Sequence, residues 1–446
     1  MSTMLPMLTE FTLSNFKSYR NSRLMIGSLT VMIGANASGK SNILEALRFL
    51  HWLANGYQLS AIQSAINIDR FIRGRVDDLC YQGESSFTIG CHLDSSEWNQ
   101  FEITINVHEG EMKITHEQIA GANDLPLYTY IVDPVIQEER KNSQFLHYID
   151  VTFNDVSKSN GDSKVQCDNR MAIFTQLDRS AFTNGDLKRF QTNSRETIHQ
   201  YQSTLQNILF LEAIPNKMRG YSYKSDLVFL KDGSNLSSIL FHLWENKPDE
   251  RQTILNLIQS LPEQAIDGLD FIFGPRNEVM VRLSETFGHN RHYYEAALLS
   301  DGTLRVLAIA AAMLYVLEGS LVVIEEIDNG IHPSRAQHLI TSIQEIAKRR
   351  NLRVLISTHN PALMDAIPND ALGDVVFCYR DPVVGDSRLV RLGDLDDLPS
   401  LILQGSLGNL VTKGVVDRFV KSPHTPEDKK KKALAWLTRM QEYSNE

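Results

Sequence analysis

Residues 31–44, VMIGANASGKSNIL, carry glycine, lysine and serine at the spacing G-x-x-x-x-G-K-[ST]. The apolar residues before the motif are typical of a buried strand, and residues 42–50 after it continue as an apolar helix. In such a strand–loop–helix, backbone N–H groups and the positive end of the helix bind phosphate. The residues predicted to form this phosphate site are Gly34, Asn36, Ala37, Ser38, Gly39, Lys40, Ser41 and Asn42.

Two side chains of this loop have separate predicted roles. Lys40 would reach the β- and γ-phosphates of a nucleotide, and the Ser41 hydroxyl would be a ligand of Mg²⁺. A chance glycine-rich turn would lack the flanking strand and helix. The segment therefore predicts binding of ATP or GTP together with Mg²⁺.

Paired acids follow an apolar stretch much later in the chain. Residues 321–324 (LVVI) predict a short strand, and Glu325 and Glu326 come directly after it. We assign Glu325 to the Mg²⁺ shell and Glu326 to general-base activation of the attacking water. A second predicted strand, residues 353–357, ends close to His359, which we assign as a sensor of the γ-phosphate.

Ser300 and Gly302 precede a long apolar helix that is predicted over residues 304–317. A hydroxyl and backbone N–H groups at a helix start can bind an anion. Serine is also favoured as an N-cap, so a structural role explains these residues when they are considered alone. Their position in order between the phosphate loop and the paired acids favours a role at a nucleotide.

Taken in order, these four elements resemble the motifs of the ATP-binding-cassette (ABC) ATPases. More narrowly, they look like the branch that contains the SMC, RecF and overcoming-lysogenization-defect (OLD) proteins. Residues 16–19 (FKSY) are similar to the F-K-S-Y of SMC heads, and the phosphate loop resembles their G-x-N-G-S-G-K-S-N, with Ala37 where glycine is usual. Residues 325–333 (EEIDNGIHP) resemble the E-E-x-E-N-G-L-H-P of OLD-like ATPases, and residues 231–236 (KDGSNL) resemble a D-G-x-N-L segment of that group.

The resemblance covers residues 1–120 and 205–380 and implies both a fold and an assembly. The expected fold class is α/β: an ABC/SMC-head-like P-loop NTPase with an antiparallel β lobe, a mixed α/β core sheet flanked by helices, and a small helical insertion. In this family two heads face each other head to tail. Ser300 and Gly302 would then contact a nucleotide held by the other head, so hydrolysis would depend on dimerisation. Asp328, at the D-loop position, would lie at the dimer seam.

Other family features are less definite in this sequence. Lys17 and Arg20 are candidates for contacts to phosphate or base by similarity to the SMC heads, and a solvated surface role is an equally good interpretation. The Q-loop glutamine of the family cannot be assigned, because Gln82, Gln118 and Gln137 all lack a distinctive context.

The chain is expected to divide into four parts. Residues 1–121 would form the first part of the ATPase head, 122–205 a partly helical insertion, 206–380 the second part of the head, and 381–446 a tail with a terminal helix. The insertion is too short for the long coiled coil of SMC proteins and shows no sustained heptads. The strands expected from alternation in the first part lie at residues 7–15, 24–26, 86–93, 101–107 and 111–117. Later, helices are expected over residues 194–211 and 237–262, and a strand within residues 271–283.

Composition is consistent with an intracellular enzyme. A chain of 446 residues with 42% hydrophobic content can bury a large core in more than one lobe. We expect a cytoplasmic protein, because the sequence shows neither a bilayer-spanning apolar run nor a signal peptide. The cysteines lack metal-site spacing and are expected to be reduced thiols; they are Cys80, Cys91, Cys167 and Cys378. The net charge of −10 argues against a surface coated for DNA, although a local patch could bind phosphates.

Two features of the tail invite functional interpretations. The lysine run at residues 429–432 is more typical of a solvated helix face than of a nucleic-acid patch. Asp394, Asp396 and Asp397 resemble the D-x-D of the TOPRIM nuclease domain that OLD proteins carry. The tail is too short for that domain and lacks an upstream glutamate motif, so we expect no nuclease within this chain.

The resemblance implies an ATPase whose head-to-tail dimerisation controls a separately encoded effector protein, such as a nuclease, in bacterial anti-phage defence. One alternative is a RecF-like repair ATPase that binds DNA directly, for which salt-dependent DNA affinity would be the evidence. Another is a scaffold that binds ATP and hardly hydrolyses it. The presence of Glu326 and His359 argues against the scaffold, although slow turnover is compatible with a switch.

Overall fold

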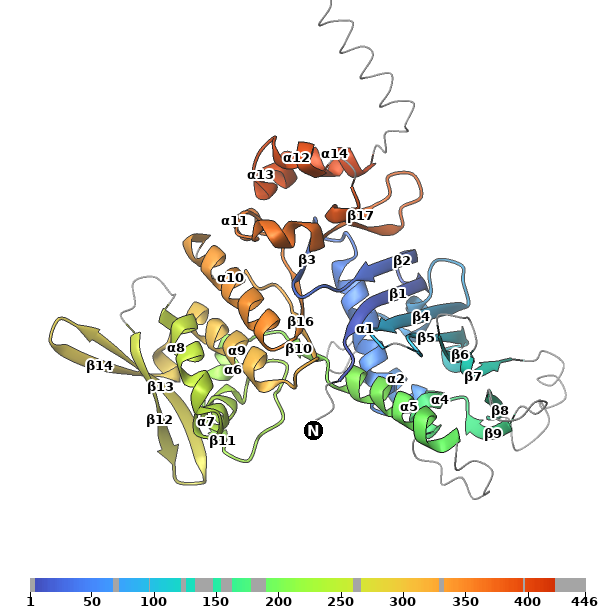
Figure 1. Ribbon diagram of the computed structural model, residues 1–446, viewed down its shortest axis with the longest axis horizontal. Coiled ribbons are helices and arrows are strands. Elements are labelled where there is room, and N and C mark those ends of the chain that lie inside the picture. Colours follow the sequence, from blue (N-terminus) through green and yellow to red (C-terminus); the bar gives the residue numbers. More distant parts are fainter. Residues whose placement is uncertain are drawn as a thin grey trace, which may run out of the picture.

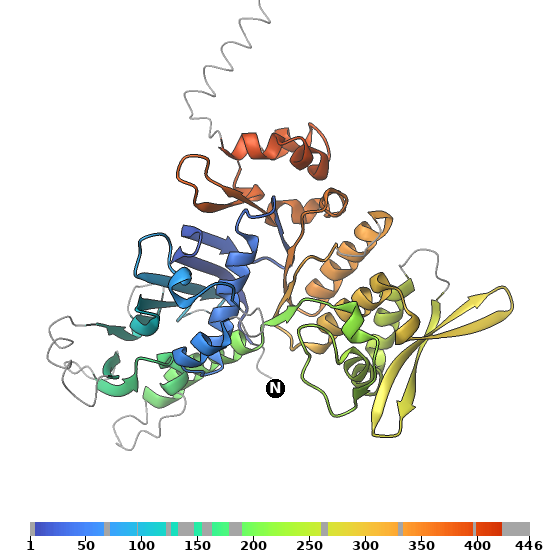
Figure 2. The same cartoon turned by 180° about the vertical axis from the view of Figure 1, so that it is seen from behind.

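The computed structural model describes residues 5–66, 72–95, 97–121, 126–132, 147–153, 163–177, 190–259, 266–328, 333–395 and 398–421. These residues form three sheets with helices packed between them (Figure 1). A six-stranded sheet lies at the centre, with an eight-stranded sheet on one side and a smaller sheet projecting on the other. Figure 2 shows the same arrangement from behind.

The central sheet has the strand order β10-β15-β16-β3-β17-β18. The strands from β10 to β17 are parallel, and β18 pairs antiparallel with β17. Their bounds are β3 Thr30–Ile33, β10 Leu209–Leu211, β15 Leu321–Ile324, β16 Arg353–Ser357, β17 Val375–Arg380 and β18 Ser387–Arg391. Every residue of β3 and β15 is buried, as expected for strands covered on both faces. The parallel order places the carboxyl ends of β3, β15 and β16 at one edge of the sheet, where ligands of such sheets bind.

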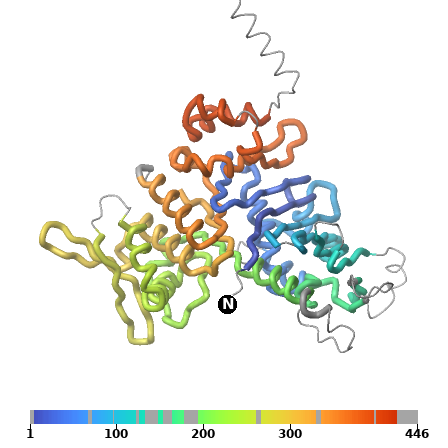
Figure 3. Tube along the Cα trace, viewed as in Figure 1, coloured from blue at the N-terminus to red at the C-terminus, as the bar shows by residue number. Residues whose placement is uncertain are grey.

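Segments from the two ends of the chain meet in this sheet. Strand β3 lies between β16 and β17, although it comes more than three hundred residues earlier in the numbering. Figure 3 shows the N-terminal strands beside the β17–β18 hairpin. The edge of the sheet that carries the phosphate loop is therefore built by both ends of the chain.

The eight-stranded sheet is antiparallel, with the order β2-β1-β4-β5-β6-β7-β8-β9. Its strands are β1 Leu8–Phe16, β2 Tyr19–Met25, β4 Ser86–Leu93, β5 Gln100–His108, β6 Glu111–Ala120, β7 Pro126–Ile131, β8 Tyr148–Phe153 and β9 Ser163–Asp168. Burial alternates along β5, which fits a sheet with one covered face. Helix α1 (Lys40–Ala54) lies against this sheet, where Phe49 meets Phe87 edge to face with ring centroids 5.5 Å apart.

A buried carboxyl joins this sheet to a short helix. Glu117 of β6 is fully buried and accepts hydrogen bonds from the Tyr128 hydroxyl at 2.7 Å and from the Ile173 and Phe174 N–H groups at 2.8 Å each. The two N–H groups belong to the start of α4 (Ile173–Leu177), so Glu117 satisfies donors that a helix start leaves open. Burial raises the pKa of Glu117 to about 7, against the effect of these hydrogen bonds.

The smaller sheet forms a projecting arm (Figure 1). It contains β11 Ser222–Tyr223, β12 Ile266–Gly274, β13 Glu278–Phe287 and β14 Asn290–Glu295. The remaining helices are α2 Leu59–Ala65, α5 Phe190–Gln206, α6 Pro215–Met218, α7 Leu236–Asn246, α8 Arg251–Gln259, α9 Asp301–Tyr315, α10 Pro333–Arg349, α11 Pro361–Asp365, α12 Leu398–Ile402, α13 Leu407–Thr412 and α14 Val415–Lys421. Short 3₁₀ helices lie at Val76–Leu79, Pro248–Glu250, Ala296–Leu298, Asn369–Asp374 and Leu392–Asp394.

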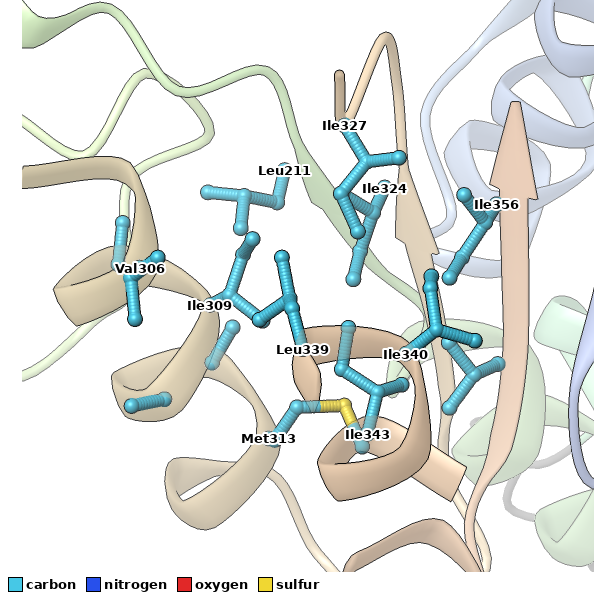
Figure 4. Packing of buried hydrophobic residues seen from close by; sticks show 14 of the residues in the cluster. Leu211, Val306, Ile309, Met313, Ile324, Ile327, Leu339, Ile340, Ile343 and Ile356 are labelled. Carbon is cyan, nitrogen blue, oxygen red and sulfur yellow. The ribbon is translucent and has the colours of Figure 1, made fainter. Parts of the chain in front are cut away.

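Helices α9 and α10 pack beside the central sheet through apolar side chains. Figure 4 shows Ile309 and Met313 of α9 facing Leu339 and Ile343 of α10, beside Ile324 of β15. The helical spacing of these residues explains the contact, because residues three or four apart share one face. This packing fixes the start of α9 relative to the end of β15.

Most expected elements occur near their predicted positions, with three informative differences. Residues 122–205 contain α4 and α5 but also strands β7 to β9, which extend the antiparallel sheet. The helix expected to reach residue 211 ends at Gln206, because residues 209–211 pair with β15 as strand β10. Residues 271–283 belong to two strands, since Asn277 adopts φ 61° in the turn between β12 and β13.

In the part of the chain that the structure describes, no helix combines the length and the apolar character needed to cross a bilayer. Helix α13 packs on α11, where the Gly408 N–H donates to Asp365 Oδ1 at 2.6 Å. The predicted terminal helix, the lysine run at 429–432, and Asp396 and Asp397 lie outside the described residues.

Candidate nucleotide-binding site

The phosphate loop lies between the end of β3 and the start of α1, beside a pocket of about 570 Å³. Residues from β15 and β16 join it, because these strands end at the same edge of the sheet. The lining residues are Lys17, Ser18, Asn36, Ala37, Ser38, Gly39, Lys40, Ser41, Asn42, Leu44, Arg73, Gly74, Glu325, Glu326, Ser357, Thr358, His359 and Arg380. The pocket thus brings together the loop, the paired acids and the histidine that the sequence assigned to one site.

The loop needs glycine at two positions. Gly34 and Gly39 adopt φ values of 146° and 114°. A Cβ atom at Gly34 would lie 2.3 Å from the Cys378 carbonyl oxygen, and one at Gly39 would lie 2.5 Å from Ser387 Oγ. Ala37 adopts φ 63°, a left-handed conformation that costs a non-glycine residue about 1–2 kcal/mol.

Lys40 lies folded against its own loop. Its Nζ donates to the carbonyl oxygens of Gly34 at 2.5 Å and Ala35 at 2.9 Å. Burial lowers the pKa of Lys40, while the carboxylates of Asp328 and Glu326 oppose that effect. A phosphate in the loop would offer Nζ a charged acceptor in place of two neutral carbonyls, and charge-assisted hydrogen bonds are the stronger kind.

The paired acids have different surroundings. Glu325 forms an ion pair through Oε1 with Arg48 of α1, and both side chains are largely buried. Its backbone N–H donates to the Leu211 carbonyl at 3.1 Å. Glu326 is exposed in the pocket and adopts φ 47°, and its N–H donates to Ser357 Oγ at 3.2 Å. A non-glycine residue held in this strained conformation is typical of functional sites.

The donor set of the pocket suits Mg²⁺ that arrives with a nucleotide. Ser41 and Glu325 both line the pocket and supply hydroxyl and carboxylate oxygens, the ligands that Mg²⁺ prefers. The described residues contain no group of three or more His, Cys, Asp or Glu side chains that could hold a metal by themselves. Mg²⁺ commonly uses one or two protein ligands together with phosphates, so the residues present fit this ion.

Asp328 is tied to the histidine loop within the same chain. It is 9% exposed and its Oδ1 accepts a hydrogen bond from Thr358 Oγ1 at 2.7 Å. Its Oδ2 lies 3.8 Å from His359 Nδ1, and the His359 side chain is half exposed. The carboxylate therefore has partners beside the pocket, whereas its expected place at a dimer seam stays a prediction. Residues 329–332 lie outside the described residues.

Three cations border the pocket besides Lys40. Lys17 and Arg73 both donate to Glu45, a buried carboxylate on α1, and Arg73 does so at 2.6 Å. Burial lowers the pKa of Lys17, and the Glu45 carboxylate opposes the shift. Arg380 lies at the end of β17, where its guanidinium donates to the Gly385 carbonyl at 2.6 Å. Lys17 thus lines the pocket, and its contact to phosphate or base stays a prediction.

Some of these residues were not identified from the sequence. Glu45 and Arg48 had a usable signal, because they lie four and seven residues after Ser41 and so share its face of α1. Arg73 and Arg380 had no local signal, since tertiary structure brings them to the pocket. Arg20 is exposed on β2 and does not line the pocket. Gln82 and Gln118 do not line it either, and Gln137 lies outside the described residues.

Ser300 and Gly302 do not line this pocket; Ser300 caps α9, and Gly302 lies in its first turn. Ser300 is the N-cap of the helix, and its Oγ accepts a hydrogen bond from the Thr303 N–H at 3.1 Å. The carbonyls of Ala297 and Leu299 accept hydrogen bonds from Arg219 at 3.0 and 2.6 Å, and the same guanidinium binds Asp301. The structural role as an N-cap is therefore present, and Ser300 also remains exposed.

The KDGSNL segment organises a loop next to these elements. Asn235 Nδ2 donates to the carbonyls of Asp226 and Val228, and its Oδ1 accepts from the Leu230 N–H. Gly233 adopts φ 73°, and a Cβ there would lie 2.6 Å from the Met218 methyl carbon. Within the described structure this segment has a local structural role.

The chain also matches known proteins in sequence. A family model described as "AAA domain, putative AbiEii toxin, Type IV TA system" matches residues 29–365. An "ATP/GTP phosphatase" from Helicobacter pylori (strain ATCC 700392 / 26695) is 21% identical over 369 residues, which cover 81% of this chain and 87% of that protein.

One solved SMC head shares the fold at low sequence identity. The SMC head bound to the C-winged helix domain of ScpA is 12% identical with a TM-score of 0.50, and the match covers 86% of this chain and 98% of that one. The SMC head domain from Thermotoga maritima is 14% identical with a TM-score of 0.40, over 86% and 98% of the two chains. The expected fold class is confirmed. The chain belongs to the AAA-domain family of putative AbiEii toxins, and its fold is that of an SMC-head-like P-loop ATPase.

Proposed function

We propose that the protein hydrolyses ATP in the pocket beside the phosphate loop. The observation that carries this proposal is the convergence of Lys40, Ser41, Glu325, Glu326 and His359 on one pocket. The family description and the relative named "ATP/GTP phosphatase" support nucleotide hydrolysis, and that name makes GTP a second substrate to test. A binding scaffold would need the loop but neither Glu326 nor His359.

Each of these residues has a proposed role in the reaction. The loop N–H groups and Lys40 would hold the β- and γ-phosphates, and Ser41 and Glu325 would hold Mg²⁺, which neutralises phosphate charge. Glu326, exposed in the pocket, would accept a proton from the attacking water. His359, flanked by Asp328, would donate a hydrogen bond to the γ-phosphate.

Two heads would complete each site. Ser300 and Gly302 do not line the pocket of their own chain, and Ser300 is exposed at a helix start, where an anion can bind. In a head-to-tail dimer they would contact the nucleotide of the partner. Asp328 would then lie at the interface between the two heads, next to His359 of its own chain. This geometry makes turnover depend on protein concentration.

Such nucleotide-dependent pairing would control a separately encoded effector, in a defence role of the kind that the family description suggests. The experiment starts with phosphate release from ATP and from GTP with Mg²⁺. Glu326→Gln should bind nucleotide yet lose about 100-fold or more in turnover, because the general base is gone. The exposed Glu345→Gln on α10 is the matched control.

The mass of the Glu326→Gln protein then tests assembly. With ATP and Mg²⁺ it should double, and the product of the neighbouring gene should be held or released. Wild-type turnover in Glu326→Gln would remove the base assignment. No hydrolysis of either nucleotide by the wild type, at any protein concentration, would contradict the proposed function. An unchanged mass would contradict the dimer.

A further inference from the structure

One face of α1 organises the charged groups around the pocket. Ser41, Glu45 and Arg48 are spaced four and three residues apart, so they follow one another along the same side of the helix. Ser41 lines the pocket, Glu45 holds the cations Lys17 and Arg73, and Arg48 holds Glu325. The helix that begins at the phosphate loop therefore also contacts the acid at the end of β15.

The Arg48 side chain is held in place by groups other than Glu325. Its guanidinium lies over the ring of Phe210 in β10, 5.4 Å from the centroid, and its side chain is 12% exposed. The carboxylates of Glu212 and Glu45 are the other charges that act on it favourably, while burial lowers its pKa. A guanidinium stacked on an aromatic ring in a buried setting has little freedom to turn.

The Glu325 side chain borders two cavities. It lines the nucleotide pocket, and it also lines a second cavity of about 380 Å³ that is bordered by Glu212, Asp301 and Arg305. Its backbone is held by the Leu211 carbonyl, but this bond does not fix the carboxylate. The ion pair with Arg48 engages Oε1, and a carboxylate keeps lone pairs on its second oxygen.

We propose that Arg48 is a positioning residue that orients Glu325 toward the Mg²⁺ bound with the nucleotide. The inference rests on the proposed function for the identity of the ligand. Arg48 lines neither cavity, so it acts through Glu325 and does not touch the nucleotide. Partners that orient a metal ligand commonly change metal affinity by 10–100-fold when they are removed.

The test is a double-mutant cycle read by binding. A fluorescent, non-hydrolysable ATP analogue is titrated with Mg²⁺ against the wild type, Arg48→Met, Glu325→Gln and the double variant. Arg48→Met should raise the Mg²⁺ midpoint about tenfold in the Glu325 background and less than about twofold in the Glu325→Gln background. Arg48→Lys keeps the charge without the planar fork, so it should lie between the wild type and Arg48→Met.

A second ion pair serves as the matched control. Arg23 pairs with the buried carboxylate of Glu10 on β1 and lies outside the pocket. Arg23→Met should leave the Mg²⁺ midpoint unchanged. If Arg48→Met does not fold, as judged by thermal melting, the cycle is run with Arg48→Lys.

Two results would overturn the inference. One is a Mg²⁺ midpoint that stays the same or falls in Arg48→Met, as expected if Arg48 only repels the ion. The other is an equal shift in both backgrounds, which would mean that Arg48 acts without Glu325. Failure of the proposed function is distinguishable, because it would appear as absent phosphate release by the wild type whatever the midpoints show.

Discussion

One region of the molecule, here called the phosphate end, is the pocket around Lys40, and six separate segments of the chain line it. At the signature end, defined by Ser300 and Gly302, one helix start is held in place by Arg219 and faces outward. The phosphate end contains charged side chains that pair with one another within the chain, whereas the signature end offers a hydroxyl and backbone N–H groups. In the proposed dimer Ser300 and Gly302 would meet the phosphate end of a second copy, whereas within one chain the start of α9 shares only the cavity that Asp301 and Arg305 border together with the paired acids.

The largest expected effect tests the phosphate end alone. Lys40→Ala should lower ATP affinity at least about 100-fold, roughly 3 kcal/mol, because the loop loses its charged contact to the β- and γ-phosphates. Equilibrium binding with a fluorescent ATP analogue measures it. Lys413→Ala, at an exposed lysine of the C-terminal helices, is the control. Retained affinity in Lys40→Ala would disprove the phosphate-site assignment.

The next effect tests whether the signature end serves another copy. Ser300→Arg should leave ATP binding by the monomer largely intact and reduce hydrolysis about 30-fold, since a large side chain would block the contact between heads. Binding and phosphate release are measured on the same preparation. Ser406→Arg changes another exposed N-cap serine, at α13, and should retain turnover. Normal hydrolysis by Ser300→Arg would contradict the two-headed site.

A smaller effect on turnover is expected behind the signature end. Arg219→Ala removes the donor to the Ala297 and Leu299 carbonyls and the partner of Asp301. Hydrolysis should fall about fivefold, because losing a charged hydrogen-bond donor costs about 1–3 kcal/mol, part of which the loop recovers through water. ATP affinity should stay within about twofold. An equal loss of affinity would show that the two ends are coupled within one chain. Arg276→Ala, in the exposed β12–β13 turn, is the control.

The smallest effect on turnover is expected from Glu117, which lies in the eight-stranded sheet away from both ends. Its folded-state pKa of about 7 lies above the ordinary value of 4.5. Ionisation therefore disfavours the folded state, and stability present below pH 4.5 is lost as the pH rises to about 7. The shift corresponds to about 3 kcal/mol at neutral pH. Glu117→Gln should remove this part of the pH dependence while turnover stays within about twofold.

Chemical unfolding of both proteins between pH 4.5 and 8 measures that difference. In Glu117→Gln the Tyr128 hydroxyl and the two N–H donors remain, but residue 117 no longer titrates. Any pH dependence of stability in the variant therefore comes from other groups. If the wild type and Glu117→Gln lose stability equally over this range, Glu117 is not the group that titrates.

The sequence predicted the site residues that belong to short motifs and missed those that reach the site through contacts between distant segments. The phosphate loop and the paired acids could be identified because each is a short motif beside a buried strand. Strands β7 to β9 gave no clear alternation, and their place in the sheet depends on pairing with β6 and with each other. Arg73 and Arg380 reach the pocket through tertiary structure, so no spacing in the sequence could indicate them.

The tight packing of the phosphate loop has a consequence for how the protein is made. Gly34 and Gly39 rest against Cys378 and Ser387, and β3 pairs with both β16 and β17. During synthesis on the ribosome, the phosphate loop emerges long before these later strands. A nascent chain therefore contains the motif before the strands that pack against it have been made. Pairing that depends on such distant segments is slow and leaves strand edges open. Nucleotide binding should therefore appear only near the end of synthesis, and ATP in the cell would stabilise the completed fold rather than guide its early steps.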